Sequence, residues 1–160
     1  MANTTFNGPV RSENGFKTIV KDANSGALTN QMTLETYTAT ITVANGDTTG
    51  KESSIGIPNN FIPMAVMIAV TTASVNNVNL QDIGTDSDTD GFVDGISVAV
   101  NSTGFKGFFP CNGVLGMSGG TTTASTATAE ATELVVSGDP GGDTVIVLKF
   151  LGISSSSDAS

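Results

Sequence analysis

Four regularly spaced aspartates form the motif in this sequence that is best suited to binding a metal ion. The pattern D-x-D-x-D-G-x-x-D is formed by Asp86, Asp88, Asp90 and Asp94. It matches the first nine positions of an EF-hand-type loop, where alternate carboxylates converge on Ca²⁺ and glycine permits a sharp turn. The twelfth position, however, is Ser97 instead of a bidentate glutamate, and the strand-like segment ISVAV follows instead of a helix. A calcium site and an ordinary acidic turn between strands both remain open.

A second motif, G-x-S-x-G, contains a serine that would be the nucleophile of a hydrolase. Residues 116–120 match it formally, with Ser118 at the centre. A nucleophile elbow needs a preceding strand, a following helix and a histidine partner, and this chain contains no histidine. Ser-His-Asp and Cys-His catalysis therefore cannot be built from one chain. We interpret residues 116–120 as a glycine loop and predict a protein that is not an enzyme.

The glycine-rich stretch GDPGGD at residues 138–143 invites comparison with phosphate-binding loops. It lacks the Lys-Ser/Thr pair of a P-loop, and its aspartates would repel phosphate. Fifteen acidic residues would allow a glycosidase-type carboxylate pair, but the chain has no tryptophan and one tyrosine to form a sugar platform. We predict that residues 138–143 are a hairpin loop joining strands at residues 134–136 and 145–151.

The charge and cysteine content exclude several classes of partner. A net charge of −9 with only six basic residues argues against nucleic acid, which requires several lysines or arginines to neutralise phosphates, and against anionic membranes. Cys111 is the only cysteine, so no intrachain disulfide forms, and we interpret it as a small buried apolar residue suited to a reducing cytoplasm. The first residues lack the apolar stretch of a signal peptide, and no apolar run reaches membrane-spanning length.

Alternation of side chains predicts a β-rich fold. In residues 36–43, threonines alternate with Tyr37, Ala39, Ile41 and Val43, which indicates a strand with one wet and one buried face in an antiparallel sheet. Residues 45–47, Asn-Gly-Asp, predict a turn. Residues 64–70 are almost wholly apolar and too short for a typical helix, so we expect a strand that is covered on both faces, by a second sheet or by another subunit.

These patterns predict an all-β, antiparallel β-sandwich, with a jelly roll as one form of it. Shorter strands are expected around residues 78–83 and 96–100. We divide the chain into an extended N-terminal arm (residues 1–34), a β-sandwich domain (35–153) and a flexible C-terminal tail (154–160). The arm packs either on a neighbouring molecule or on its own domain.

Apolar residues outside the regular strands are candidates for an interface. The candidates are Phe6, Val10 and Phe16 in the arm, and Phe105, Phe108 and Phe109 before Pro110. Core packing is the ordinary role of such a phenylalanine cluster. If the three are exposed together, they mark a subunit contact, because isolated soluble surfaces rarely show such patches.

Three stretches resemble small virion proteins of marine and cyanobacterial phages, in particular head decoration or cement proteins. They are TTFNGPVRSENGFK, then IGTDSDTDGFVDGISVAV with the following GFKGFFPCNG, and VVSGDPGGDTVIVLKFLGI. The resemblance implies a homotrimer on the outer surface of the capsid, assembled in the host cytoplasm and bridging subunits of the major capsid protein. A tail or fibre β-module that recognises a host glycan, with calcium in the acidic loop, is the alternative.

Overall fold

The computed structural model describes residues 17–21, 25, 28–57, 61–113 and 130–155. The strands in this part of the chain are β1 (Lys17–Lys21), β2 (Leu28–Val43), β3 (Thr49–Ile57), β4 (Phe61–Thr72), β5 (Asn79–Thr85), β6 (Asp88–Val93), β7 (Val98–Ala99), β8 (Gly104–Pro110), β9 (Glu130–Val136) and β10 (Thr144–Ser155). All their pairings are antiparallel. The predicted all-β antiparallel fold is thereby confirmed. The described residues contain no helix that is long and apolar enough to span a membrane.

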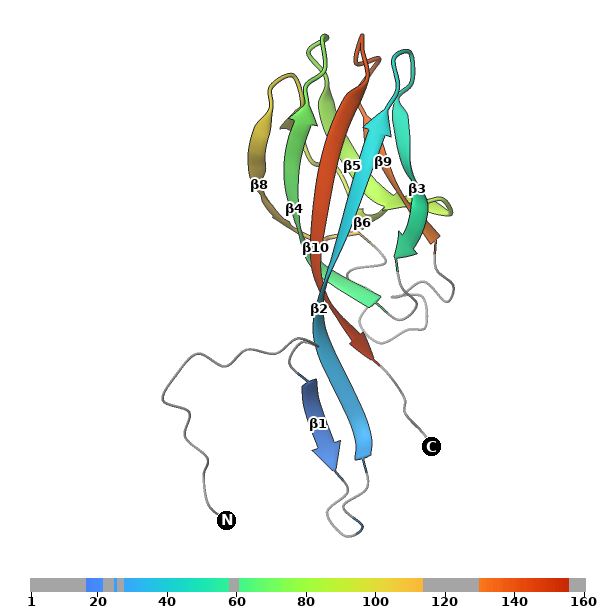
Figure 1. Cartoon of the computed structure of the whole chain (residues 1–160), viewed down its shortest axis with the longest axis vertical. Helices are drawn as coiled ribbons and strands as arrows, with labels where there is room; N and C mark the ends of the chain where they lie inside the picture. Colours follow the sequence, from blue (N-terminus) through green and yellow to red (C-terminus); the bar gives the residue numbers. More distant parts are fainter. Residues whose placement is uncertain (1–16, 22–24, 26–27, 58–60, 114–129, 156–160) are drawn as a thin grey trace.

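One continuous sheet curls on itself and encloses the core (Figure 1). The strand order is β6-β5-β9-β3-β2-β10-β4-β8, with β1 added to β2 and β7 added to β5. The rings of Phe92 on β6 and Phe150 on β10 lie 5.5 Å apart between centroids, although four strands separate β6 from β10 in the order. The facing layers are therefore two halves of one sheet, and neither two separate sheets nor a jelly roll is confirmed.

Backbone hydrogen bonds link the two ends of the curled sheet. After β8, the amide of Cys111 donates to the carbonyl of Met64 on β4 (2.9 Å), and the amide of Gly113 donates to Phe92 on β6 (3.0 Å). The side chain of Asn112 completes the contact by pairing with the backbone of Asp94. The segment 111–113 thus joins the edge strands β8 and β6, which lie at opposite ends of the strand order.

The alternation predicted in residues 36–43 is confirmed in β2. Ala39, Ile41 and Val43 are fully buried, while the threonines between them are exposed. β2 pairs with β10 from Met32 to Val43 and, near its start, with β1. It runs without interruption across residue 34, where we placed the boundary between arm and domain. The lower part of β2 and β1 project below the curled sheet (Figure 1).

Buried aliphatic and aromatic side chains fill the inside of the curl. The largest fully buried ones are Phe61, Phe92, Phe150, Ile41, Ile68, Leu80, Ile83, Leu134, Ile146, Leu148 and Val43. They come from both halves of the sheet, so each half provides the apolar cover that the other requires. Burial of a side chain of this size contributes about 1.5–3 kcal/mol. The interior is therefore a packed core, and its largest side chains come from β2, β4, β5, β6, β9 and β10.

The predicted hairpin between residues 134–136 and 145–151 is wrong. β9 pairs with β3 and β5, whereas β10 pairs with β2 and β4. The loop at residues 137–143 therefore crosses from one half of the sheet to the other. The turn residues correctly indicated that the chain reverses direction, but glycine, proline and aspartate carry no information about which strand is the next neighbour.

Candidate interaction surface

The outer side of β4, β8 and β10 carries apolar side chains that the curled sheet leaves uncovered. Inward-facing Val66, Ile68 and Val70 of β4 are buried, so Met67 and Ala69 between them point outward. Met67 lies opposite Phe108, and Ala69 lies opposite Phe105. Across the other edge of β4, Ala69 lies opposite Val147. Cross-strand partners share a face, so these residues form a continuous apolar stripe.

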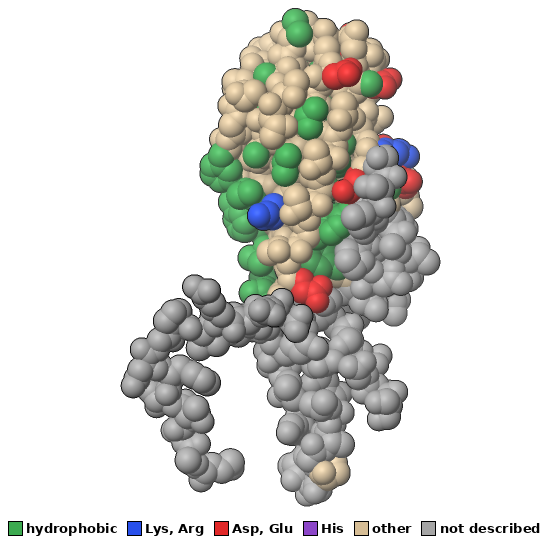
Figure 2. All heavy atoms as spheres, in the orientation of Figure 1, with side chains coloured by type: hydrophobic (Ala, Val, Ile, Leu, Met, Phe, Trp, Pro, Cys, Tyr) green, Lys and Arg blue, Asp and Glu red, His purple; other side chains and the backbone are tan. Residues whose placement is uncertain are grey.

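This surface, which we call the outer face, contains most of the exposed large apolar side chains among the described residues. Phe105 is 65% exposed, Phe108 57%, Met64 51% and Leu34 46%. Met64 breaks the alternation of β4 because it is the extra residue of a bulge, where Leu151 and Gly152 pair with Ala65 and Pro63. Leu34 extends the face onto β2, because it lies opposite Ile153 of β10. Figure 2 shows hydrophobic side chains gathered on the side of the molecule where β8 and β4 lie. Contiguous exposed apolar surface of this kind marks interaction sites in soluble proteins.

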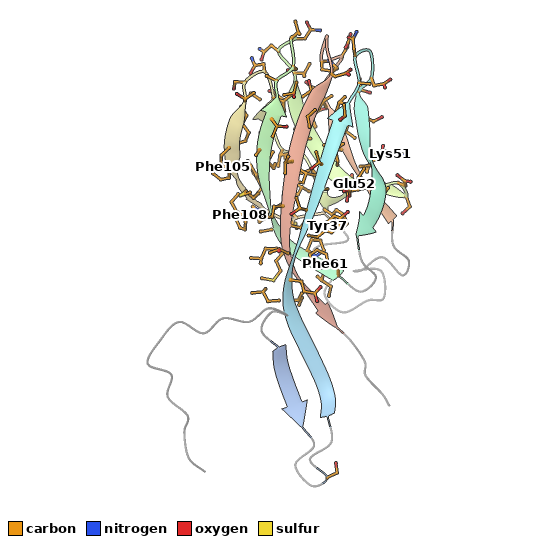
Figure 3. All side chains as sticks on the ribbon, in the orientation of Figure 1. Tyr37, Lys51, Glu52, Phe61, Phe105 and Phe108 are labelled. Atoms are coloured by element: carbon orange, nitrogen blue, oxygen red, sulfur yellow. The ribbon has the colours of Figure 1, made fainter. Side chains whose placement is uncertain are left out.

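A β-bulge in β8 places Phe105 and Phe108 on the same side of the sheet. In a regular strand, residues three apart point to opposite faces. Here the register shifts between Ile68 and Ala69, which pair with Gly107 and Phe105, so Lys106 is the extra residue. Gly107 has a φ of 145°, which is accessible to glycine but rarely to other residues. As a result both phenylalanines project outward (Figure 3), while half-buried Phe109 packs against the core.

Charge is distributed unevenly between the two halves of the sheet. The sequences of β2, β4, β8 and β10 contain one carboxylate, Glu35, and two lysines, Lys106 and Lys149. The carboxylates of the other half and its turns are Glu52, Asp82, Asp86, Asp88, Asp90, Asp94 and Glu133, and those in the loops that join the two halves are Asp47, Asp139 and Asp143. Figure 3 shows Lys51, the lysine of that half, on the side of the molecule away from Phe105 and Phe108. The outer face is therefore apolar with a cationic component in a protein of net charge −9.

The acidic motif forms a tight hairpin. Thr85 pairs with Asp88, so Asp86 and Ser87 make the turn between β5 and β6. Asp86 forms an ion pair of 3.0 Å with Lys51, which also contacts Glu133 at 3.1 Å. Within the described ranges, no three His, Cys, Asp or Glu side chains gather as a group able to hold a metal ion. The structure therefore does not bring Asp86, Asp88, Asp90 and Asp94 together into a calcium loop.

Two titratable groups at the core, Tyr37 and Cys111, have raised pKa values, which favour their protonated forms. The Tyr37 hydroxyl donates a hydrogen bond to the Glu52 carboxylate, and burial together with this bond raises the pKa of Tyr37 well above its ordinary value. Burial raises the pKa of the Cys111 thiol to about 12. A thiol with that pKa is protonated and a poor nucleophile at neutral pH. The interpretation of Cys111 as a small buried residue is confirmed.

Some of the remaining residues that the sequence suggested as sites can be compared with the structure, and others lie outside the described ranges. Phe6, Val10, Phe16 and the motif around Ser118 belong to the latter. The core role considered for the phenylalanine cluster is wrong for Phe105 and Phe108. Met64, Met67 and Lys149 were missed as candidates. The apolar run at residues 64–70 was the available signal, because a strand apolar on both sides needs two covers and the curled sheet provides only the inner one.

Comparisons of the chain with protein-family models, curated proteins and solved structures found no match.

Proposed function

We propose that this protein is a non-enzymatic structural component of a bacteriophage particle, a capsid decoration or cement protein that bridges and stabilises major capsid protein subunits. The observation that carries the proposal is the uncovered outer face around Phe105, Phe108 and Met64. A decoration protein requires a stiff fold and an apolar contact surface, and it requires no catalytic groups. The resemblance of three sequence stretches to phage virion proteins supplies the class of partner.

The mechanism is mechanical. Docking removes apolar surface from water, and fully burying one phenylalanine or methionine side chain contributes about 1.5–3 kcal/mol. If one copy contacts two neighbouring capsid subunits, this free energy is available only while the subunits remain together. A homotrimer, as the resemblance implies, would repeat the contact around a local three-fold position and multiply its effect. The continuous sheet behind the outer face keeps the contact residues in fixed relative positions.

A binding assay on capsids tests the proposal. Empty shells of the phage that encodes this chain, assembled without it, are mixed with the purified protein and sedimented. We expect the wild-type protein to sediment with the shells and to raise the temperature at which they disassemble. If it binds phage tails or host glycans and leaves the shells unoccupied, the capsid proposal fails and a tail or fibre role replaces it.

A further inference from the structure

The free edge of β8 is poorly suited to pairing with a strand from a partner. β8 is the last strand in the order, and no described strand pairs with its outer edge. Lys106 forms a bulge in the middle of the strand, and Pro110, which has no amide N–H, ends it. Bulges, lysines and prolines are the features that prevent strand addition at sheet edges. A partner is therefore expected to contact the outer face through side chains.

Lys149 lies within the apolar surface of this face. It is exposed, and its neighbours across the two adjacent strands are Thr38 and Met67. Both ion pairs among the described residues are formed by Lys51, and Lys149 forms none with another described residue. Docking of an apolar partner would desolvate this ammonium group, which is costly unless the partner provides a negative charge. The charge on Lys149 therefore restricts which surfaces can dock.

A second copy of the chain does not satisfy both requirements. If two outer faces met, the lysines of both copies would come together. The strands of this face contain one carboxylate, Glu35, and it lies in the lower part of β2. The acidic half of another copy would supply carboxylates, but the exposed large apolar side chains of the described chain are on the outer face, apart from Val75 in the β4–β5 loop. A self-contact thus matches either the apolar or the charged component and leaves the other unmatched.

We propose that the outer face docks face-on against a different protein, on a surface where apolar side chains surround a carboxylate, and that this carboxylate pairs with Lys149. Phe105 and Phe108 supply the apolar contact, and Lys149 supplies selectivity for the acidic group. The identification of that protein as the capsid subunit rests on the proposed function; the chemistry of the contact rests on the exposure, register and charge of the outer face.

Affinity for empty shells, measured with full-length variants, tests this contact. The variant Phe105→Ser/Phe108→Ser is expected to weaken binding by about 30-fold or more, as for central aromatic contacts. Val75→Ser, which alters an exposed apolar residue outside the face, is the matched control and is expected to bind as wild type. Circular dichroism establishes that each variant is folded before binding is compared.

Salt dependence tests the role of Lys149. Wild-type affinity is expected to fall as NaCl rises from about 0.05 M to about 0.5 M, because salt screens the ion pair. Lys149→Gln is expected to bind about 5- to 10-fold more weakly at low salt and to lose most of this dependence. Thr89→Glu changes the net charge by the same one unit, from −9, on the exposed side of β6. It is expected to behave as wild type.

The outcomes separate the two proposals. Failure of the wild-type protein to bind shells would overturn the capsid function itself. Wild-type binding that is unaffected by the phenylalanine and lysine variants would leave that function standing and overturn the assignment of the outer face. If the variants instead change the oligomeric state in analytical ultracentrifugation, with shell affinity unchanged, the face is a contact between copies and the proposed partner is wrong.

Discussion

The hydrogen bond between Tyr37 and Glu52 connects the core to the acidic half of the sheet. Tyr37 comes from β2 and Glu52 from β3, and Glu52 is buried. The Tyr37 ring also packs against Phe150, with 6.1 Å between ring centroids. A buried carboxylate needs donors to offset lost hydration. The phenol therefore contributes to packing and also provides a hydrogen-bond donor for Glu52. Because the donated bond requires the protonated phenol, the free energy of unfolding is expected to depend on whether Tyr37 is protonated.

Tyr37 is the only tyrosine in the chain, so tyrosinate absorbance reports it alone. Its pKa is raised by burial and by the bond to Glu52, so ionisation is less favourable in the folded than in the unfolded state. The resulting stabilisation is present below pH ~10 and is lost as pH rises above that value, where the unfolded chain releases its proton. We expect tyrosinate to form only as the protein unfolds. Glu52→Gln should lower the pH at which it forms; native-state ionisation near pH 10 in wild type would contradict this account.

Gly84 marks a close approach between β5 and β6. A Cβ atom at this position would lie 1.9 Å from the carbonyl oxygen of Asp88 and 2.6 Å from the carbonyl carbon of Thr89. Gly84→Ala is therefore expected to reduce the free energy of unfolding by about 3 kcal/mol. Gly138→Ala is the matched control, because its nearest contact would be Val78 at 3.7 Å, and it should change stability by less than about 0.5 kcal/mol. Equal denaturation midpoints for the two variants would show that the hairpin backbone is not as close as described.

Individual strands were more predictable from sequence than their neighbours were. Alternation in β2 identified its buried side because a strand has a two-residue period. The apolar run in β4 indicated a need for two covers. The bulge at Lys106 was not predictable. It reverses the face on which Phe105 lies, and no residue type in this stretch of sequence indicates that a bulge occurs there. The pairing of β9 and β10 with other strands was equally hidden, because turn residues specify a change of direction and not a partner.

Asp139 connects two loops at the upper end of the sheet. Its Oδ1 accepts hydrogen bonds from the amides of Gly141 (2.8 Å) and Gly46 (2.9 Å), and these bonds, in that order, lower its pKa. In the same region, Asp143 accepts from the amide of Asn45 (3.0 Å). The β2–β3 loop is thus held to the crossover loop by two adjacent carboxylates.

Asp139→Ala is expected to accelerate amide hydrogen exchange at Gly46 and Gly141, because both amides lose their acceptor. Asp143→Ala should act on Asn45 instead and serves as the matched control. Because the pKa of Asp139 is lowered in the folded state, its contribution is present above pH ~4 and lost as pH falls through the folded-state value. Wild-type exchange at acidic pH, corrected for intrinsic rates, should approach that of the alanine variant. Unchanged protection at Gly46 in Asp139→Ala would exclude this role.

The whole molecule has two chemically different sides. One half of the sheet and its turns carry most of the described carboxylates, and the other half carries the exposed Phe105, Phe108 and Met64 together with two lysines. The acidic half favours solubility and opposes non-specific association. In the proposed docking, this division would orient the protein on its partner, since only one side offers both apolar area and positive charge. The curl of the sheet produces it by directing the two halves outward in opposite directions.

Cryo-electron microscopy of the particle that contains this chain tests the central claim most directly. We predict density for it at repeated positions on the outer capsid surface, with β4, β8 and β10 against the shell. Phe105 and Phe108 should be buried there, and a capsid carboxylate should lie within ion-pair distance of Lys149. Density confined to the tail or fibres, or a capsid-bound protein whose outer face points into solvent, would contradict the account.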